Sequence, residues 1–146
     1  MSAQSEYNHW FRKMVAKGCP ALITEIALKE HNRVEYLEAT IPHSDESRVV
    51  RISTRGCELM VSVHTHHCHF DGAEEGNHDA AFSKMIEWVR DFMSDKIVIC
   101  TQYKAGRIVS STSTYDRESL VAREGCNMEV VSYSEGLSGE RRSRGP

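Results

Sequence analysis

One short stretch of the chain concentrates the side chains that can do chemistry. Residues 61–72 read VSVHTHHCHFDG, and five of the eight histidines lie between His64 and His78. Imidazole, thiolate and carboxylate groups bind transition metals, exchange protons and pair with charged partners. The stretch therefore leaves three kinds of chemistry open: metal binding, catalysis, and recognition of another protein.

Metal binding depends on how the side chains of this stretch are displayed. The apolar pattern predicts one long strand from Glu58 to Phe70, in which alternate residues share a face. The first face then presents His64, His66 and Cys68. The opposite face presents His67, His69 and Asp71. As an alternative reading, a zinc or nickel ion would take its ligands from His64, His66, Cys68 and His69.

Catalysis would need a nucleophile or base held beside a partner group. Cys68 could form a thiolate–imidazolium pair with His67 or His69. Adjacent residues on a strand point to opposite faces, however, so sequence neighbours make poor partners. The sequence also shows no glycine-rich phosphate loop and no nucleophile elbow. We therefore expect no enzymatic activity and, apart from the alternative metal, no cofactor.

Recognition of a protein is favoured by the charge that follows the histidines. Residues 67–95 contain seven acidic side chains against two basic ones, a net charge of −5, whereas the whole chain has −3. An acidic border with imidazoles suits a basic partner, because opposite fields accelerate encounter. The predicted partner-binding residues are His67, His69, Asp71, Glu74, Glu75 and Asp79.

The length and composition of the chain restrict the class of protein to which it can belong. A length of 146 residues with 40% hydrophobic and 27% charged residues is typical of one globular domain. The net negative charge speaks against a nucleic-acid-binding protein. Five widely spaced cysteines predict reduced thiols and a cytoplasmic location. No run approaches the roughly 20 apolar residues of a membrane span, and no signal peptide is expected.

The elements that must position these residues follow from hydrophobic periodicity. Helices are predicted over residues 5–17 and 77–94. Strands are predicted in a hairpin over residues 21–41, then over 48–54, 58–70, 97–103, 107–114 and 126–133. The predicted class is α+β: an antiparallel sheet of about six strands, with an N-terminal helix and a long central helix packed on one side. We expect one domain over residues 1–134 and a disordered basic tail over residues 135–146.

The order of elements resembles a group of small bacterial proteins in which a strand ends in an H-x-H-F-D pattern. The matching residues are His67, His69, Phe70 and Asp71, followed by an acidic loop, an amphipathic helix and a hairpin. Some members of that group are similar to immunity proteins of polymorphic or contact-dependent toxin systems. The resemblance implies a non-enzymatic protein that covers the basic face of a cognate toxin. The additional His64, His66 and Cys68 depart from the pattern, which keeps the metal alternative open.

Overall fold

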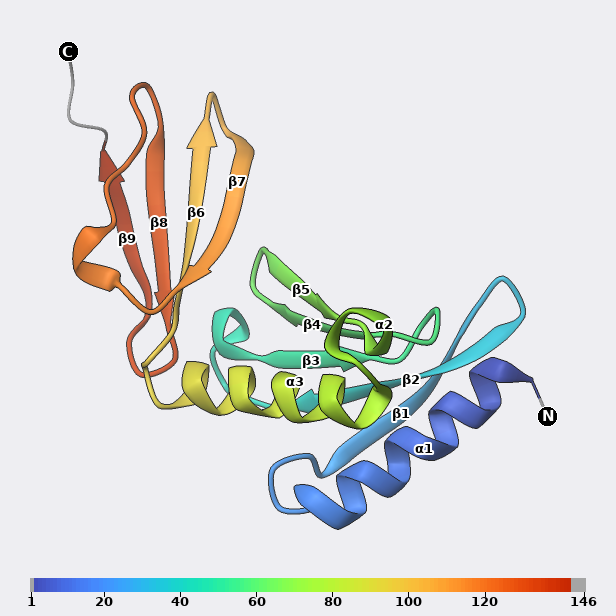
Figure 1. The fold of residues 1–146 in the computed structure, drawn as a ribbon. Coiled ribbons are helices and arrows are strands. Elements are labelled where there is room, and N and C mark those ends of the chain that lie inside the picture. Colours follow the sequence, from blue (N-terminus) through green and yellow to red (C-terminus); the bar gives the residue numbers. More distant parts are fainter. Residues whose placement is uncertain (1, 143–146) are drawn as a thin grey trace. The chain divides into compact units, whose positions relative to one another are not determined.

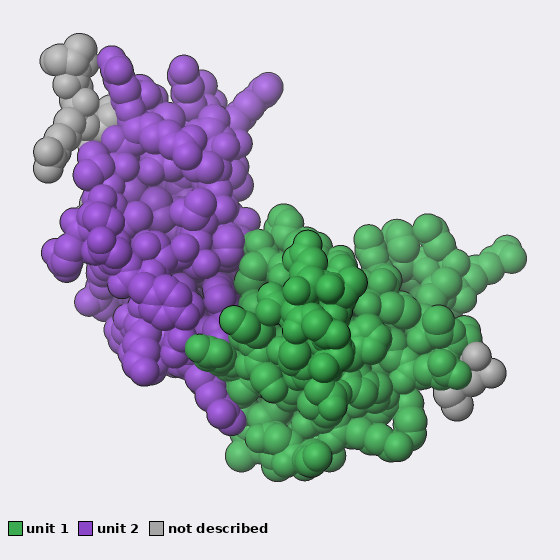
Figure 2. All heavy atoms as spheres, in the orientation of Figure 1, with its two compact units in different colours: residues 1–43, 49–62, 67–87 green, residues 44–48, 63–66, 88–146 purple. Residues whose placement is uncertain are grey.

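The chain folds into two compact units. The computed structural model describes residues 2–142. Unit 1 comprises residues 1–43, 49–62 and 67–87, and unit 2 comprises residues 44–48, 63–66 and 88–146 (Figure 2). The single domain expected over residues 1–134 stays a prediction, and both units draw residues from that range.

The predicted α+β class is confirmed, although the strands form two antiparallel sheets instead of one (Figure 1). Periodicity identifies a strand but does not reveal which strand it pairs with, because pairing depends on residues distant in the sequence. The five-stranded sheet has the order β1 (Glu25–His31), β2 (Val34–Ile41), β3 (Val50–Ser53), β4 (Leu59–Val63) and β5 (His66–Phe70). The four-stranded sheet has the order β7 (Arg107–Thr114), β6 (Val98–Lys104), β8 (Asn127–Ser132) and β9 (Gly136–Arg142).

Two long helices accompany the strands, as the sequence predicted. The Asn77 side chain caps the second of them by accepting the Ala80 backbone N–H at 2.8 Å. In unit 1 the rings of Phe11 and Phe82 meet edge to face, with centroids 6.0 Å apart, and thereby join the two helices. The helices are α1 (Ala3–Gly18), α2 (Gly72–Glu75) and α3 (His78–Met93), with the short 3-10 turns η1 (Glu46–Arg48) and η2 (Arg117–Ser119).

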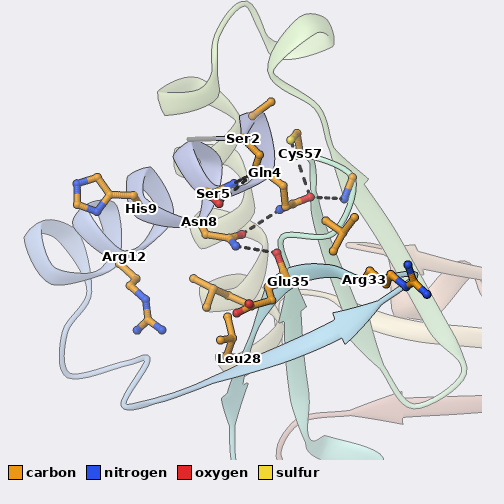
Figure 3. A pocket seen from close by; sticks show the side chains of 14 residues that line it. Ser2, Gln4, Ser5, Asn8, His9, Arg12, Leu28, Arg33, Glu35 and Cys57 are labelled. Atoms are coloured by element: carbon orange, nitrogen blue, oxygen red, sulfur yellow. Dashed lines mark hydrogen bonds between the residues drawn. The ribbon is translucent and has the colours of Figure 1, made fainter.

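A polar network fixes the start of α1 in unit 1 (Figure 3). The Gln4 amide donates to the Thr54 carbonyl at 2.8 Å and to Asn8 Oδ1 at 2.9 Å. Its carbonyl accepts the Gly56 backbone N–H at 3.0 Å. The Asn8 amide in turn donates to the Glu35 carbonyl at 3.0 Å. These bonds satisfy polar groups beside β2 and β3, and they set the position of the first turns of α1.

Unit 2 has a core of its own. Alternate residues of β6 and β8 point inward, as the period of two requires, and pack together with Ala122. Thr101 and Gln102 of β6 are buried as well, so this strand is covered on both faces. The inward-pointing core residues are Val98, Cys100, Met128 and Val130.

The predicted strand from Glu58 to Phe70 is wrong, because the chain turns back on itself at His64 and Thr65. β4 ends at Val63 and β5 begins at His66, and the two strands are neighbours in the sheet. His64 has a φ of 52°, in the left-handed region. Histidine enters this region more readily than most residues. A two-residue turn without glycine, asparagine or proline leaves little signal in a sequence.

The predicted tail also differs from the structure. Residues Gly136–Arg142 form β9 and pair with β8 in antiparallel register, whereas residues 143–146 lie outside the described part of the chain. Gly136 turns the chain with a φ of 69°. A strand at a sheet edge can be held by backbone hydrogen bonds, so polar composition alone does not exclude it.

Candidate functional site

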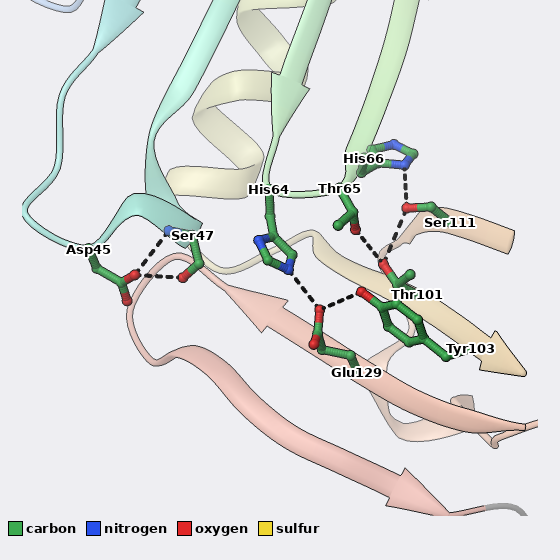
Figure 4. A network of polar contacts seen from close by, with 9 residues as sticks. All are labelled: Asp45, Ser47, His64, Thr65, His66, Thr101, Tyr103, Ser111 and Glu129. Carbon is green, nitrogen blue, oxygen red and sulfur yellow. Dashed lines mark hydrogen bonds and ion pairs between the residues drawn. The ribbon is translucent and has the colours of Figure 1, made fainter. Parts of the chain in front are cut away.

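The tip of the β4–β5 hairpin belongs to unit 2, where it is held by polar contacts (Figure 4). His64 Nε2 lies 2.7 Å from Glu129 Oε1, and the Tyr103 hydroxyl donates to the same oxygen at 3.3 Å. The hydroxyl oxygens of Thr65 and Thr101 lie 2.9 Å apart. These contacts fasten the turn to β6 and β8, and they engage the His64 imidazole with a carboxylate.

His66 follows the turn and is only 8% exposed. Its Nδ1 atom lies 3.2 Å from the Ser111 hydroxyl, and its ring stacks on Trp88 with centroids 6.2 Å apart. An imidazole at this distance from a hydroxyl can act as a general base in principle. The ring is covered from solvent, however, so a substrate has little access to it. We interpret the pair as part of the packing of unit 2.

The structure does not keep His64 on the strand face that was predicted to present it with His66 and Cys68. His64 lies in the turn, and His64 and His66 belong to unit 2, whereas Cys68 and His69 belong to unit 1. Within residues 2–142, no group of three or more His, Cys, Asp or Glu side chains is placed to hold a metal ion. Burial raises the pKa of the Cys68 thiol to about 12, which disfavours the thiolate that a metal site or a nucleophile requires.

The predicted partner-binding residues all belong to unit 1. The side chains of His67 and His69 are exposed on the same face of β5, and their rings meet edge to face at 5.5 Å. His69 Nδ1 also lies 2.9 Å from Glu58 Oε1. Glu74 and Asp79 are exposed, while Asp71 and Glu75 are half-buried. The alternation predicted for this part of the strand is therefore confirmed.

Four carboxylates of this border have no basic partner in the part of the chain that the structure describes. Asp71 accepts the Ala73 backbone N–H at 2.8 Å, and Asp79 accepts the indole N–H of Trp10 at 2.8 Å. Among the described residues, no lysine or arginine forms an ion pair with any of the four. Within the described residues of unit 1, no ion pair with a lysine or arginine neutralises these four charges. We call the four the acidic border: Asp71, Glu74, Glu75 and Asp79.

A cavity of about 360 Å³ lies between the start of α1 and the start of α3 in unit 1. The sequence predicted an N-terminal helix packed on the sheet and gave no sign of this cavity. Gly72 is needed beside it, because a Cβ atom there would lie 2.5 Å from His78 Nδ1. No sequence motif links α1 with residues 57 and 78, so only the fold could reveal the site. The lining residues are Ala3, Glu6, Tyr7, Trp10, Cys57 and His78.

The Tyr7 hydroxyl is an unusual feature of this region. Tyr7 is 4% exposed, and its hydroxyl has no hydrogen-bond partner among the described residues. Burial raises its pKa, and the charges of Cys57, Glu58 and Asp71 raise it further. The phenol therefore stays neutral, in surroundings where negative charge is unfavourable.

Removal of this hydroxyl is expected to leave the protein equally stable or to stabilise it. A buried donor without a partner costs about 1–3 kcal/mol, so Tyr7→Phe should raise the free energy of unfolding by up to about 1 kcal/mol. Urea unfolding of the two proteins measures the difference. A loss of more than about 1 kcal/mol would contradict the prediction, because it would mean that the hydroxyl forms a stabilising hydrogen bond.

The comparisons add no family assignment. The chain matched no protein-family model, no curated protein and no solved structure. None of the helices within residues 2–142 has the length and apolar character needed to cross a membrane. Arguments about function therefore depend on the geometry and charge described above.

Proposed function

We propose that this chain is a non-enzymatic binding protein that neutralises a basic protein partner, and that this partner is a toxin of a contact-dependent or polymorphic system. The acidic border supports the proposal most directly. Its four carboxylates, which have no lysine or arginine partner within residues 2–142, create a negative field in unit 1. A toxin that acts on nucleic acid would present the complementary positive surface.

The chemistry of the surrounding residues is consistent with binding and requires no cofactor. His67 and His69 extend the border with exposed imidazoles, which can donate hydrogen bonds to a partner. All five cysteines lie in the described chain and no disulfide joins them, as suits a protein that acts in the cytoplasm. The half-buried Cys68 thiol has a pKa of about 12, which makes it a poor nucleophile at neutral pH.

The proposal predicts a loss of protection after charge reversal. We expect the toxin to be a larger protein with a basic C-terminal domain, encoded by a neighbouring gene. Glu74→Lys with Glu75→Lys should weaken binding to that domain at least tenfold at physiological salt, mainly through a slower association rate. The difference should shrink as salt is added, because exposed charges are screened. Cell survival during co-expression and binding kinetics provide the measurements.

The matched control makes the same change in net charge elsewhere in unit 1. Glu25→Lys with Glu30→Lys replaces two exposed acids of β1. This control should retain protection and nearly the original affinity. Equal losses in both double variants would mean that net charge alone matters. Full protection by the Glu74/Glu75 variant would place the interface elsewhere.

A further inference from the structure

The cavity in unit 1 brings three aromatic rings together. The ring centroids of Tyr7 and Trp10 are 4.9 Å apart, and the ring of His78 lies 5.1 Å from the first and 5.4 Å from the second. The ring planes are inclined by 42°, 83° and 49°. Rings inclined in this way cannot fully cover one another's faces. Aromatic faces carry partial negative charge and attract cations within about 6 Å.

Formal negative charge surrounds the same rings. Glu6 lines the cavity, and Asp79 accepts the indole N–H of Trp10. A carboxylate at the indole N–H pushes electron density toward the ring and strengthens the attraction of its face for a cation. Burial is the main cause of the raised pKa of Tyr7, and the charges of Cys57, Glu58 and Asp71 raise it further, which is consistent with negative charge near the ring. The described lining residues include no lysine or arginine.

We propose that this cavity binds a small organic ammonium ion with a methylated head group. The volume of about 360 Å³ is near the lower end of small-molecule sites, which span about 300–1,000 Å³, so it suits a head group with a short chain. The aromatic rings replace little of the hydration shell of a primary ammonium group, for which Glu6 is the one carboxylate among the described lining residues. Within residues 2–142 no three His, Cys, Asp or Glu side chains are placed together to hold a metal ion. A methylated ammonium is weakly hydrated, so it loses less on entry and retains its charge.

This site is independent of the proposed protein partner, because it needs only unit 1 and a small ligand. Choline is the probe, and 3,3-dimethylbutan-1-ol is its uncharged counterpart of nearly equal shape. Binding is monitored through the NMR signal of the Trp10 indole N–H. The hydrogen bond to Asp79 gives this signal a distinctive chemical shift. Choline should bind with a dissociation constant in the millimolar range or tighter. The uncharged alcohol should bind about fivefold to thirtyfold more weakly, as expected for a cation on aromatic faces.

Two variants locate the site and one serves as a control. Trp10→Leu removes the largest ring, and Glu6→Gln removes the lining charge without removing the NMR reporter. Calorimetric titration should show choline affinity reduced at least fivefold by Trp10→Leu and about twofold to fivefold by Glu6→Gln. Glu30→Gln changes an exposed acid of β1, outside the cavity lining, and should leave the affinity unchanged.

Several results would overturn the proposal. Equal binding of choline and the alcohol would mean that the cavity selects shape and not charge. Absence of a saturable shift below about 20 mM choline would mean that no specific site exists. An unchanged affinity in Glu6→Gln and in a folded Trp10→Leu would place the ligand elsewhere. If Trp10→Leu fails to fold, the Glu6→Gln result decides. None of these outcomes depends on whether the Glu74/Glu75 variant protects cells.

Discussion

Phe11→Ala is expected to lower the free energy of unfolding of unit 1 by about 3–5 kcal/mol. The side chain is 0% exposed, and it lies on the buried face of α1 between Tyr7 and Val15. Its ring contacts Phe82 of α3 edge to face, so truncation removes contacts between two helices as well as apolar burial. A loss of this size is a large part of the total stability of a domain, which is about 5–15 kcal/mol.

Tryptophan fluorescence can follow unit 1 separately. Trp10 belongs to unit 1 and Trp88 to unit 2, so a Trp88→Phe background leaves one reporter in unit 1. Urea unfolding of that background with and without Phe11→Ala measures the change. Leu28→Ala in β1 is the control, because Leu28 is 56% exposed and its truncation should cost less than about 1 kcal/mol. Similar losses in the two variants would contradict the assignment of Phe11 to the core.

The second large effect is a loss of stability between pH 9 and pH 12. Burial raises the pKa of the Cys68 thiol from 9.0 to about 12. Above pH 9 the thiol ionises in the unfolded chain but stays protonated in the folded one. The unfolded state then binds fewer protons, so the free energy of unfolding falls as pH rises. The expected slope from this one group is about −1.4 kcal/mol per pH unit until the folded pKa is reached.

Cys68→Ala should remove this contribution. Urea unfolding at steps between pH 8 and pH 10 gives the slope for both proteins. The free energy of unfolding of the variant will still fall as pH rises, because burial also raises the pKa of Cys57. The raised pKa of Tyr7 lowers the free energy of unfolding further above pH 10. Because the unfolded thiol ionises around pH 9, the free energy of unfolding should fall by about 1.4 kcal/mol less in the variant than in the original protein over the whole interval from pH 8 to pH 10. Parallel slopes would mean that the Cys68 thiol ionises as readily in the folded protein as in the unfolded one.

Local signals in the sequence were sufficient for much of the fold. The spacing of apolar residues predicted both long helices, and Asn77 marked the start of α3 through its capping hydrogen bond. The β1–β2 turn was also foreseen, and Asn32 and Arg33 adopt φ values of 49° and 63° there. In each case the residues that determine the structure are close together in the sequence.

Features that depend on distant residues were missed. His64 enters the left-handed region without a glycine or asparagine signal, and β9 pairs through its backbone despite a polar composition. The exposure of the predicted border residues followed from the alternation along β5 and was confirmed for His67 and His69. The aromatic cavity could not be foreseen, because Trp10 and His78 meet only after the chain has folded.

The interleaving of the two units has a consequence for synthesis on the ribosome. Every residue of unit 1 lies within the first 87 positions, so all of unit 1 is translated before the larger part of unit 2. Unit 2 contains residues 44–48 and 63–66, which emerge long before the rest of it. The contact between His64 and Glu129 can therefore form only after Glu129 has been translated, long after His64. A recombinant fragment starting at residue 88 would lack both early segments, whereas a fragment ending at residue 87 retains the whole of unit 1.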